Sequence, residues 1–223
     1  IKYLIFEKIV FQRPKDFDFI QFLLKQKKVK AWVNCTRRAY PIYKQIKNEY
    51  VGGKLFLSIN GNNWGMACNS IHMIDLLAFF SGQTYIKIDI NELENIIYFS
   101  KRNESFKEMK GTLKVETRKG HKLHLIDNPG YKGDPEIKIL FNDFQYKIIE
   151  QKSILIKKKS DRVIYKKNVN FPFLSSIIGK IVDQIFEGGD CDLSPYDECS
   201  VYHILMLNAF NTHFSNIFGK NIT

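Results

Sequence analysis

The spacing of hydrophobic residues predicts that the chain opens with a strand, a helix and a second strand. Residues 1–11 are almost continuously apolar, which is typical of a strand that is covered on both faces in a parallel sheet. Residues 16–27 repeat apolar positions at helical spacing, and residues 30–34 form a second short strand. This order is half of a doubly wound unit. Because the sequence starts at Ile1 inside an apolar run, we expect it to be the later part of a longer chain.

The next segment predicts two helices with a strand between them. A helix starts at residues 38–41 and stops at the glycine pair 52–53, and a strand follows at 54–60. A Gly- and Asn-rich loop then leads to a second helix. We predict that residues 68–70 cap the start of this helix and that Gly82 caps its end.

After Gly82 the pattern changes to short β-branched runs with alternating polarity. They lie at residues 85–90, 96–100, 112–117, 121–126, 136–141, 144–150 and 153–158. Two helices, at 171–186 and 195–218, close the chain. The pattern predicts an antiparallel meander with one face packed on helices.

The charge balance does not by itself identify a partner. Lysine and arginine number 34 against 23 acidic residues, which gives a net charge of +11. The lysines are scattered, whereas a nucleic-acid interface usually concentrates its charge beside arginine and aromatic side chains. Lysine is also common on sheet-edge strands, where it discourages unwanted pairing. The charge fits an anionic substrate or a cofactor phosphate at least as well as a nucleic acid.

Neither a membrane segment nor a metal site is expected from the sequence. No apolar run approaches the ~18–20 residues that a membrane span needs, and residues 1–11 lack the features of a signal peptide. The cysteines Cys35, Cys68, Cys191 and Cys199 contain no C-x-x-C pair, so we expect reduced thiols in the cytoplasm. The pair His121-x-x-His124 lies in a predicted strand without a third ligand, and we therefore expect no metal.

Residues 60–82 hold the most distinctive candidate chemistry. An Asn- and Gly-rich loop ends at Trp64, and His72 and Asp75 lie on neighbouring positions of one face of the helix that follows. A loop, a tryptophan and a histidine near a helix start suit a concave site for a small polar molecule. A buried helix in which His72 only hydrogen-bonds a neighbour explains the same residues.

Several short motifs in a fixed order carry a family resemblance. They are Glu7-Lys8 after a hydrophobic strand, Arg38-x-Tyr40-Pro41, Gly53-Lys54-Leu55, His72-x-x-Asp75-Leu76 and Leu193-Ser194-Pro195-Tyr196-Asp197-Glu198. Together, and over nearly the whole chain, they resemble the Gfo/Idh/MocA oxidoreductases, the superfamily of glucose–fructose oxidoreductase and inositol dehydrogenase.

The resemblance implies a dinucleotide-binding domain followed by an open antiparallel sheet. We therefore predict that residues 1–36 are the C-terminal remnant of a dinucleotide-binding (Rossmann) domain. Residues 37–223 would form an α+β substrate-binding and oligomerisation domain, whose large, mainly antiparallel open sheet is flanked by helices. The sequence has no G-x-G-x-x-G turn, so we expect NAD or NADP to bind the longer protein and not this part alone. We also expect a homo-oligomer that packs through the sheet face.

The resemblance also implies hydride transfer between a nicotinamide and a carbon of a sugar, a sugar derivative or a cyclitol. It makes Lys8 and His72 the catalytic residues, with Glu7 and Lys8 beside the cofactor. The residues that we expect at the substrate are Trp64, Asn63, Asn69, Arg38 and Asp75. Two positions depart from the family pattern: Ile9 stands where Pro is usual, and Cys68 stands where many members carry Asp.

The chemistry agrees with these roles. An alcohol that is oxidised must give its hydroxyl proton to a base, and histidine titrates near neutral pH. The ammonium of Lys8 would favour a neutral His72 and stabilise the charge that develops on the alkoxide. Trp64 could cover an apolar sugar face while Asn63 and Asn69 bind hydroxyls. A loop with a purely structural tryptophan is an equal alternative.

Three functions therefore remain open. The first is the substrate-binding part of an NAD(P)-dependent oxidoreductase, inactive without its cofactor-binding half. The second is a non-catalytic relative that serves as a dimerisation or protein-binding module, which Cys68 in place of Asp favours. The third is a basic nucleic-acid-binding domain.

Overall fold

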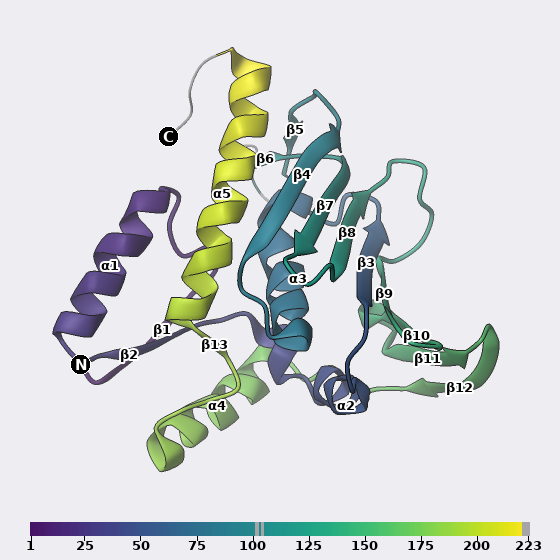
Figure 1. Ribbon diagram of the computed structural model, residues 1–223, viewed down its shortest axis with the longest axis horizontal. Coiled ribbons are helices and arrows are strands. Elements are labelled where there is room, and N and C mark those ends of the chain that lie inside the picture. The colour runs from purple at the N-terminus through teal and green to yellow at the C-terminus, as the bar shows by residue number, and fades with distance from the viewer. Residues whose placement is uncertain (101–102, 104, 220–223) are drawn as a thin grey trace.

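The largest element of the fold is an open eight-stranded sheet with helices packed against one face (Figure 1). The computed structural model describes residues 1–100, 103 and 105–219. The sheet has the strand order β12-β11-β10-β9-β3-β8-β7-β4. These strands are β3 (Leu55–Gly61), β4 (Ile86–Leu93), β7 (Gly111–Thr117), β8 (Lys122–Asp127), β9 (Glu136–Phe141), β10 (Phe144–Ile149), β11 (Ile154–Lys159) and β12 (Arg162–Asn168).

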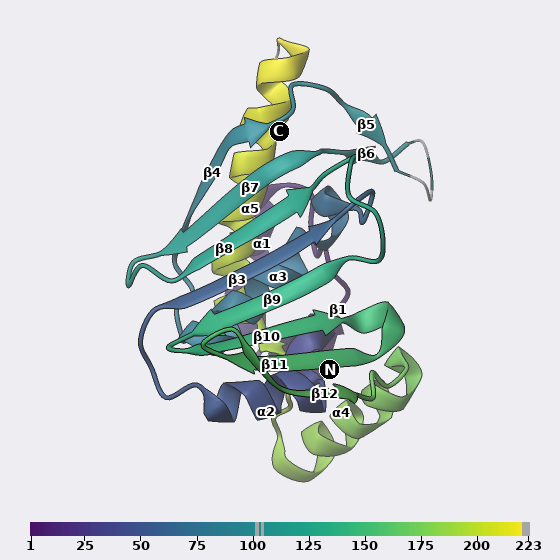
Figure 2. The same cartoon turned by 90° about the vertical axis from the view of Figure 1, so that its right-hand side faces the viewer.

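Strand β3 lies in the middle of this sheet, although it is the first of its strands in the sequence (Figure 2). It pairs in parallel with β8 and antiparallel with β9, and the other neighbours are all antiparallel. The α+β class and the mainly antiparallel open sheet are therefore confirmed. The predicted meander is interrupted, because β3 separates β8 from β9. Strand β12, which the sequence analysis missed, extends the sheet at one edge.

A second, small sheet holds the first part of the chain. Strands β1 (Tyr3–Phe6) and β2 (Lys30–Val33) pair in parallel and are joined by α1 (Pro14–Gln26). Strand β13 (Ser194–Pro195) adds an antiparallel neighbour beside β2. β1 is shorter than the apolar run at 1–11, because the residues after Phe6 leave the sheet and reach α3. Helix α4 (Leu174–Gly188) covers the face of this sheet opposite α1 and buries its isoleucines against Trp32 (Figure 1).

Helices α3 (Met66–Ser81) and α5 (Tyr196–Phe218) form the layer between the two sheets (Figure 1). Helix α3 is mostly apolar and none of its residues is exposed; Ile71, Leu76 and Phe80 have no exposed surface at all. A helix of this kind must be enclosed, so α3 forms the centre of the core. The remaining elements are α2 (Pro41–Glu49), the 3-10 helices η1 (Thr36–Ala39) and η2 (Glu150–Lys152), and the hairpin strands β5 (Tyr98–Phe99) and β6 (Lys107–Glu108).

The two ends of α3 compare differently with the sequence prediction. Gly82 ends the helix in the left-handed conformation, with φ of 66°, as predicted. The predicted start is wrong, because the helix begins at Met66, two residues before the proposed cap. Gly65 occupies the cap position with φ of 77°, a conformation that glycine adopts without strain. Because glycine has no side chain, the helix has no side-chain cap at this position. Ser70 instead donates to the carbonyl of Met66 from inside the first turns.

The outer face of the large sheet, which faces the viewer in Figure 2, carries charged as well as apolar side chains. The carboxylate of Glu136 lies between the ammonium groups of Lys138 and Lys147. Edge strand β12 exposes most of its side chains, including its arginine and lysines. Charged side chains on an edge strand discourage pairing with a strand of another molecule. Among the described residues, no helix has the length and apolar character that crossing a membrane would require.

Candidate functional site

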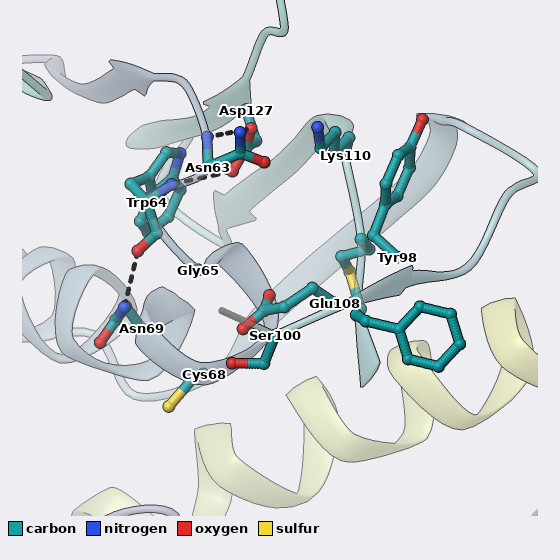
Figure 3. Close-up of a pocket in the computed structure, with 12 residues that line it drawn as sticks. Asn63, Trp64, Gly65, Cys68, Asn69, Tyr98, Ser100, Glu108, Lys110 and Asp127 are labelled. Atoms are coloured by element: carbon teal, nitrogen blue, oxygen red, sulfur yellow. Dashed lines mark hydrogen bonds between the residues drawn. The ribbon is translucent and has the colours of Figure 1, made fainter. Parts of the chain in front are cut away.

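A pocket of about 250 Å³ lies at the N-terminal end of α3, between this helix, the end of β8 and the β5–β6 hairpin (Figure 3). Its wall mixes amide, carboxylate, ammonium and aromatic groups. The residues that line it are Asn63, Trp64, Gly65, Cys68, Asn69, Tyr98, Phe99, Ser100, Glu108, Met109, Lys110 and Asp127. Three of them, Asn63, Trp64 and Asn69, were expected at the substrate.

Asp127, the last residue of β8, fixes the loop that forms one wall of this pocket. Its carboxylate accepts the backbone N–H groups of Asn63, at 2.8 Å, and Trp64, at 3.2 Å (Figure 3). The Trp64 indole donates to the carbonyl of Ile126 at 2.9 Å, and the Asn69 amide donates to the carbonyl of Trp64 at 2.8 Å. Burial raises the pKa of Asp127, while the two backbone N–H groups act in the opposite direction. The loop therefore holds Trp64 in one orientation.

Glu108, from β6, binds the free N–H groups at the start of α3. Its carboxylate accepts the N–H of Ala67 at 2.8 Å, and this replaces the missing side-chain cap. Burial is the main cause that raises the pKa of Glu108; the negative charge of Asp127 adds to it, and the backbone N–H groups lower it. Two carboxylates with raised pKa therefore face the same pocket.

Lys8 connects the first part of the chain to this end of α3. Its ammonium donates to the carbonyl of Cys68 at 3.0 Å and lies 3.4 Å from both the Cys68 sulfur and the Asn69 side-chain oxygen. Cys68 and Asn69 belong to the pocket wall, so Lys8 lies directly behind that wall. Glu7 points elsewhere and accepts a hydrogen bond from the Asn34 amide at 2.6 Å. The peptide bond between Lys8 and Ile9 is cis.

His72 lies one helical turn after Cys68. Burial lowers the pKa of His72 well below its ordinary value, and the positive charges of Arg37 and Lys8 lower it further. The imidazole is therefore neutral near pH 7. Its Nδ1 atom is buried and has no hydrogen-bond partner in the part of the chain that the structure describes. His72 does not line the pocket itself.

Arg38 and Asp75, which were also expected at the substrate, do not line this pocket. Arg38 donates two hydrogen bonds to the Asp75 carboxylate, at 3.0 and 2.7 Å, and Tyr202 donates a third at 2.6 Å. Asp75 has no exposed surface and Arg38 is only 7% exposed. Both carboxylate oxygens are occupied, and these residues tie η1, α3 and α5 together. Their contact with substrate stays a prediction.

The sequence analysis missed the pocket residues Tyr98, Glu108, Lys110 and Asp127. Asp127 could have been predicted from the sequence, because it ends a strand. The strand β8 runs parallel to β3, so both end at the same edge of the sheet, where ligands commonly bind. The other three sit on and beside the β5–β6 hairpin; a strand was predicted over β5, but the two-residue strand β6 was not, and no local pattern places this hairpin beside α3. Lys110 lies over the ring of Tyr98, 4.4 Å from its centroid, which joins the two sides of the hairpin.

No protein-family model matches the sequence, and no curated protein matches it. Solved structures do share the fold. A Gfo/Idh/MocA family oxidoreductase from Vibrio cholerae superposes with a TM-score of 0.63 at 13% identity, covering 97% of this chain and 71% of that one. An oxidoreductase from Agrobacterium radiobacter, solved with NAD+, L-tartaric acid and magnesium, gives 0.67 at 12% identity, with coverage of 95% and 71%.

A third similar structure has a named activity. It is the UDP-N-acetylglucosamine 3-dehydrogenase GnnA from Acidithiobacillus ferrooxidans, with a TM-score of 0.65, 11% identity and coverage of 92% of this chain and 67% of that one. Identities this low show the fold alone. The helices and the open sheet align over nearly all of this chain in each case. The chain therefore has the fold of the Gfo/Idh/MocA-type oxidoreductases, and the fold that its motifs imply is confirmed.

Proposed function

We propose that this chain is the substrate-binding part of a nicotinamide-dependent oxidoreductase that acts on a hydroxyl group of a sugar, a sugar derivative or a cyclitol. The observation that carries the proposal is the position of Lys8. Its ammonium lies against the first turns of α3, one helical turn before His72 and behind the pocket wall at Asn69. A cation and a neutral imidazole therefore lie just outside the lining of a polar pocket, next to its wall at Cys68 and Asn69.

These two side chains have complementary roles in alcohol oxidation. His72 takes the hydroxyl proton, for which it must be neutral at the working pH, and burial together with Arg37 and Lys8 keeps it so. Lys8 stabilises the negative charge that develops on the substrate oxygen. The nicotinamide, when bound, accepts the hydride. On this proposal Trp64 and Asn69 orient the substrate at the pocket wall.

The cofactor belongs, on this proposal, to a dinucleotide-binding domain of which residues 1–36 are the last part. The parallel β1–α1–β2 arrangement supports this, because among the described residues β1 has a neighbour on one side only and could pair with a further strand on the other. The sequence has no phosphate-binding G-x-G-x-x-G turn, so residues outside it would hold the pyrophosphate. Glu7, at the end of β1, and Lys8 would then lie at the cofactor side of the substrate.

The decisive experiment measures turnover in the protein that includes the dinucleotide-binding domain. The change in NAD(P)H absorbance would be followed with a panel of sugars, nucleotide sugars and cyclitols. We expect Lys8→Ala and His72→Ala each to lower kcat/KM by about two to four orders of magnitude, the usual effect of removing a positioned acid–base group. The double variant should lose less than the product of the two effects, because the groups act on one hydroxyl.

Matched controls are available for both residues. Lys15 is exposed in α1, and His124 lies on the outer face of the large sheet, where it packs on Phe56. Lys15→Ala and His124→Ala should leave kcat/KM unchanged. If Lys8→Ala and His72→Ala fold normally and turn over at the rate of these controls, the catalytic assignment is wrong.

A non-catalytic binding role is the second candidate, and Cys68 favours it. Where many relatives carry a carboxylate, Lys8 meets a backbone carbonyl and a thiol. A binding module would take up a member of the same panel in isothermal titration calorimetry yet show no change in NAD(P)H absorbance. Turnover of any member of the panel would exclude this candidate.

A further inference from the structure

Two cysteines that are far apart in the sequence meet in the core beside α5. Cys35 lies two residues after the end of β2, and Cys199 lies in the first turn of α5. Neither has any exposed surface. Their sulfur atoms lie within 4.8 Å of one another, and a carboxylate oxygen of Asp75 lies within the same distance of both. The pocket and the Lys8–His72 pair do not use these thiols.

His203 lies one turn after Cys199 on α5, and its Nδ1 atom lies next to the Cys199 sulfur. Its Nδ1 atom lies 2.9 Å from the backbone carbonyl of Cys199 and 3.2 Å from the sulfur of that residue. A carbonyl oxygen can only accept, so Nδ1 carries the hydrogen. The same N–H therefore faces the sulfur, where it stabilises a thiolate.

The two thiols are unequal for this reason. Burial raises the pKa of Cys199, but the hydrogen bond from the Cys35 thiol and the positive charge of His203 lower it more, to about 6. The pKa of Cys35 is raised, first by its hydrogen bond to Cys199 and then by burial. These interactions favour the thiolate at Cys199 and the thiol at Cys35, the combination that disulfide formation requires.

The same atoms also suggest a metal site, but their bonding argues against one. A structural zinc ion takes four ligands. Both oxygens of Asp75 already accept hydrogen bonds from Arg38, and one accepts from Tyr202 as well. Nδ1 of His203 is protonated. Of this group, only the two sulfur atoms remain free to bind a metal ion.

We propose that Cys35 and Cys199 are a reversible redox pair that closes to a disulfide between the end of β2 and α5. With hydrogen peroxide as oxidant, the Cys199 thiolate attacks one oxygen, the O–O bond breaks, and a sulfenic acid and hydroxide form. The Cys35 sulfur then displaces the hydroxyl from the sulfenic sulfur, giving the disulfide and water. In total, two thiols and one peroxide give one disulfide and two waters.

The disulfide would fasten the first part of the chain to the last helix. Cys35 precedes η1, which carries Arg38, and Asp75 lies three residues after His72 on α3. The bond would therefore close beside the Arg38–Asp75 pair and remove a negative thiolate from its surroundings. Both thiols are fully buried, so on this proposal peroxide, a small molecule, reaches them through local opening of the structure. This inference does not depend on the proposed function.

Peptide mapping tests the bond directly. The reduced protein, freed of reductant, is treated with hydrogen peroxide, alkylated and digested with trypsin. We expect peptide 31–37, which holds Cys35, to be linked to peptide 181–220, and dithiothreitol to release it. Because peptide 181–220 also holds Cys191, the map is repeated in Cys191→Ser, where the link should persist. It should be lost in Cys35→Ser and Cys199→Ser.

The oxidised wild type should also melt at a higher temperature than the reduced protein, because the bond closes a long loop in the unfolded chain. Peroxide should leave the melting temperature of Cys35→Ser unchanged. The wild-type and Cys191→Ser maps decide the matter even if the other variants do not fold. The proposal is overturned if half-exposed Cys68 and Cys191 oxidise while no 31–37 link forms. Stoichiometric zinc in the purified protein that blocks the link would overturn it as well.

Discussion

Asp75 is a fully buried carboxylate whose charge is balanced by a single arginine. Its hydrogen-bond partners come from two other elements, Arg38 on η1 and Tyr202 on α5. A buried ion pair gains little over a well-packed apolar pair, but removal of one partner leaves an uncompensated charge. The pair therefore fixes the geometry of α3 more than it adds to the free energy of folding.

Arg38→Ala should lower the free energy of unfolding by about 3–5 kcal/mol, the usual cost of leaving a buried partner unpaired. Urea denaturation followed by circular dichroism measures it. The control is Arg13→Ala, because Arg13 pairs with Asp16 at the surface, where a salt bridge contributes at most about 1 kcal/mol. Equal losses in the two variants would show that the Arg38–Asp75 pair is not buried as described.

The start of α3 shows how an element can depend on a residue far away in the sequence. Propensity and cap residues placed the start at 68–70, but the helix begins at Met66 because Glu108 supplies the acceptor that the local sequence lacks. No local pattern could reveal a cap some forty residues downstream. The C-terminal end was predictable, since Gly82 acts through its own backbone.

Glu108→Ala should therefore destabilise the protein by about 1–2 kcal/mol, the effect of losing a helix N-cap. It should also weaken ligand binding, because the first turn of α3 forms the pocket wall. Glu108→Gln keeps an acceptor oxygen and should recover part of the stability. Glu116→Ala, which removes an exposed carboxylate on β7, is the matched control. A Glu108→Ala protein as stable as this control would argue against the cap.

Strand prediction succeeded where a strand has one buried and one outer face. Strands β3, β8, β9 and β10 alternate in this way and were located to within about two residues, the usual boundary error. Strand β12 failed because its side chains are nearly all exposed, so no alternation marks it. At the site, the loop at Asn63 and Trp64 and the helix that carries Asn69 were predictable from local patterns. Glu108 and Lys110 depend on tertiary contacts that no local pattern encodes.

At the scale of the whole molecule, the outer face of the large sheet is the surface through which we expect two copies to associate. Phe56 and Leu140 are cross-strand neighbours on this face and remain half-buried in the single chain. Light scattering at tens of micromolar should therefore show a homo-oligomer. Leu140→Glu should shift it toward monomer, because a charge would be buried in the interface.

The control for this prediction is Lys180→Gln, which makes the same change in net charge on an exposed position of α4. It should leave the oligomer intact. A wild-type protein that scatters only as a monomer, or an oligomer that Leu140→Glu does not weaken, would contradict association through this face.

The central position of β3 also sets an order of events during folding. Its neighbours are β8 and β9, and both follow it in the sequence after α3 and several further strands. The groups β4–β7–β8 and β9–β12 can each close from local hairpins, whereas β3 must wait for both of them. During synthesis its apolar segment emerges long before either neighbour exists. Joining the two halves of the sheet is therefore the late step, and until then β3 is the segment most exposed to wrong pairing.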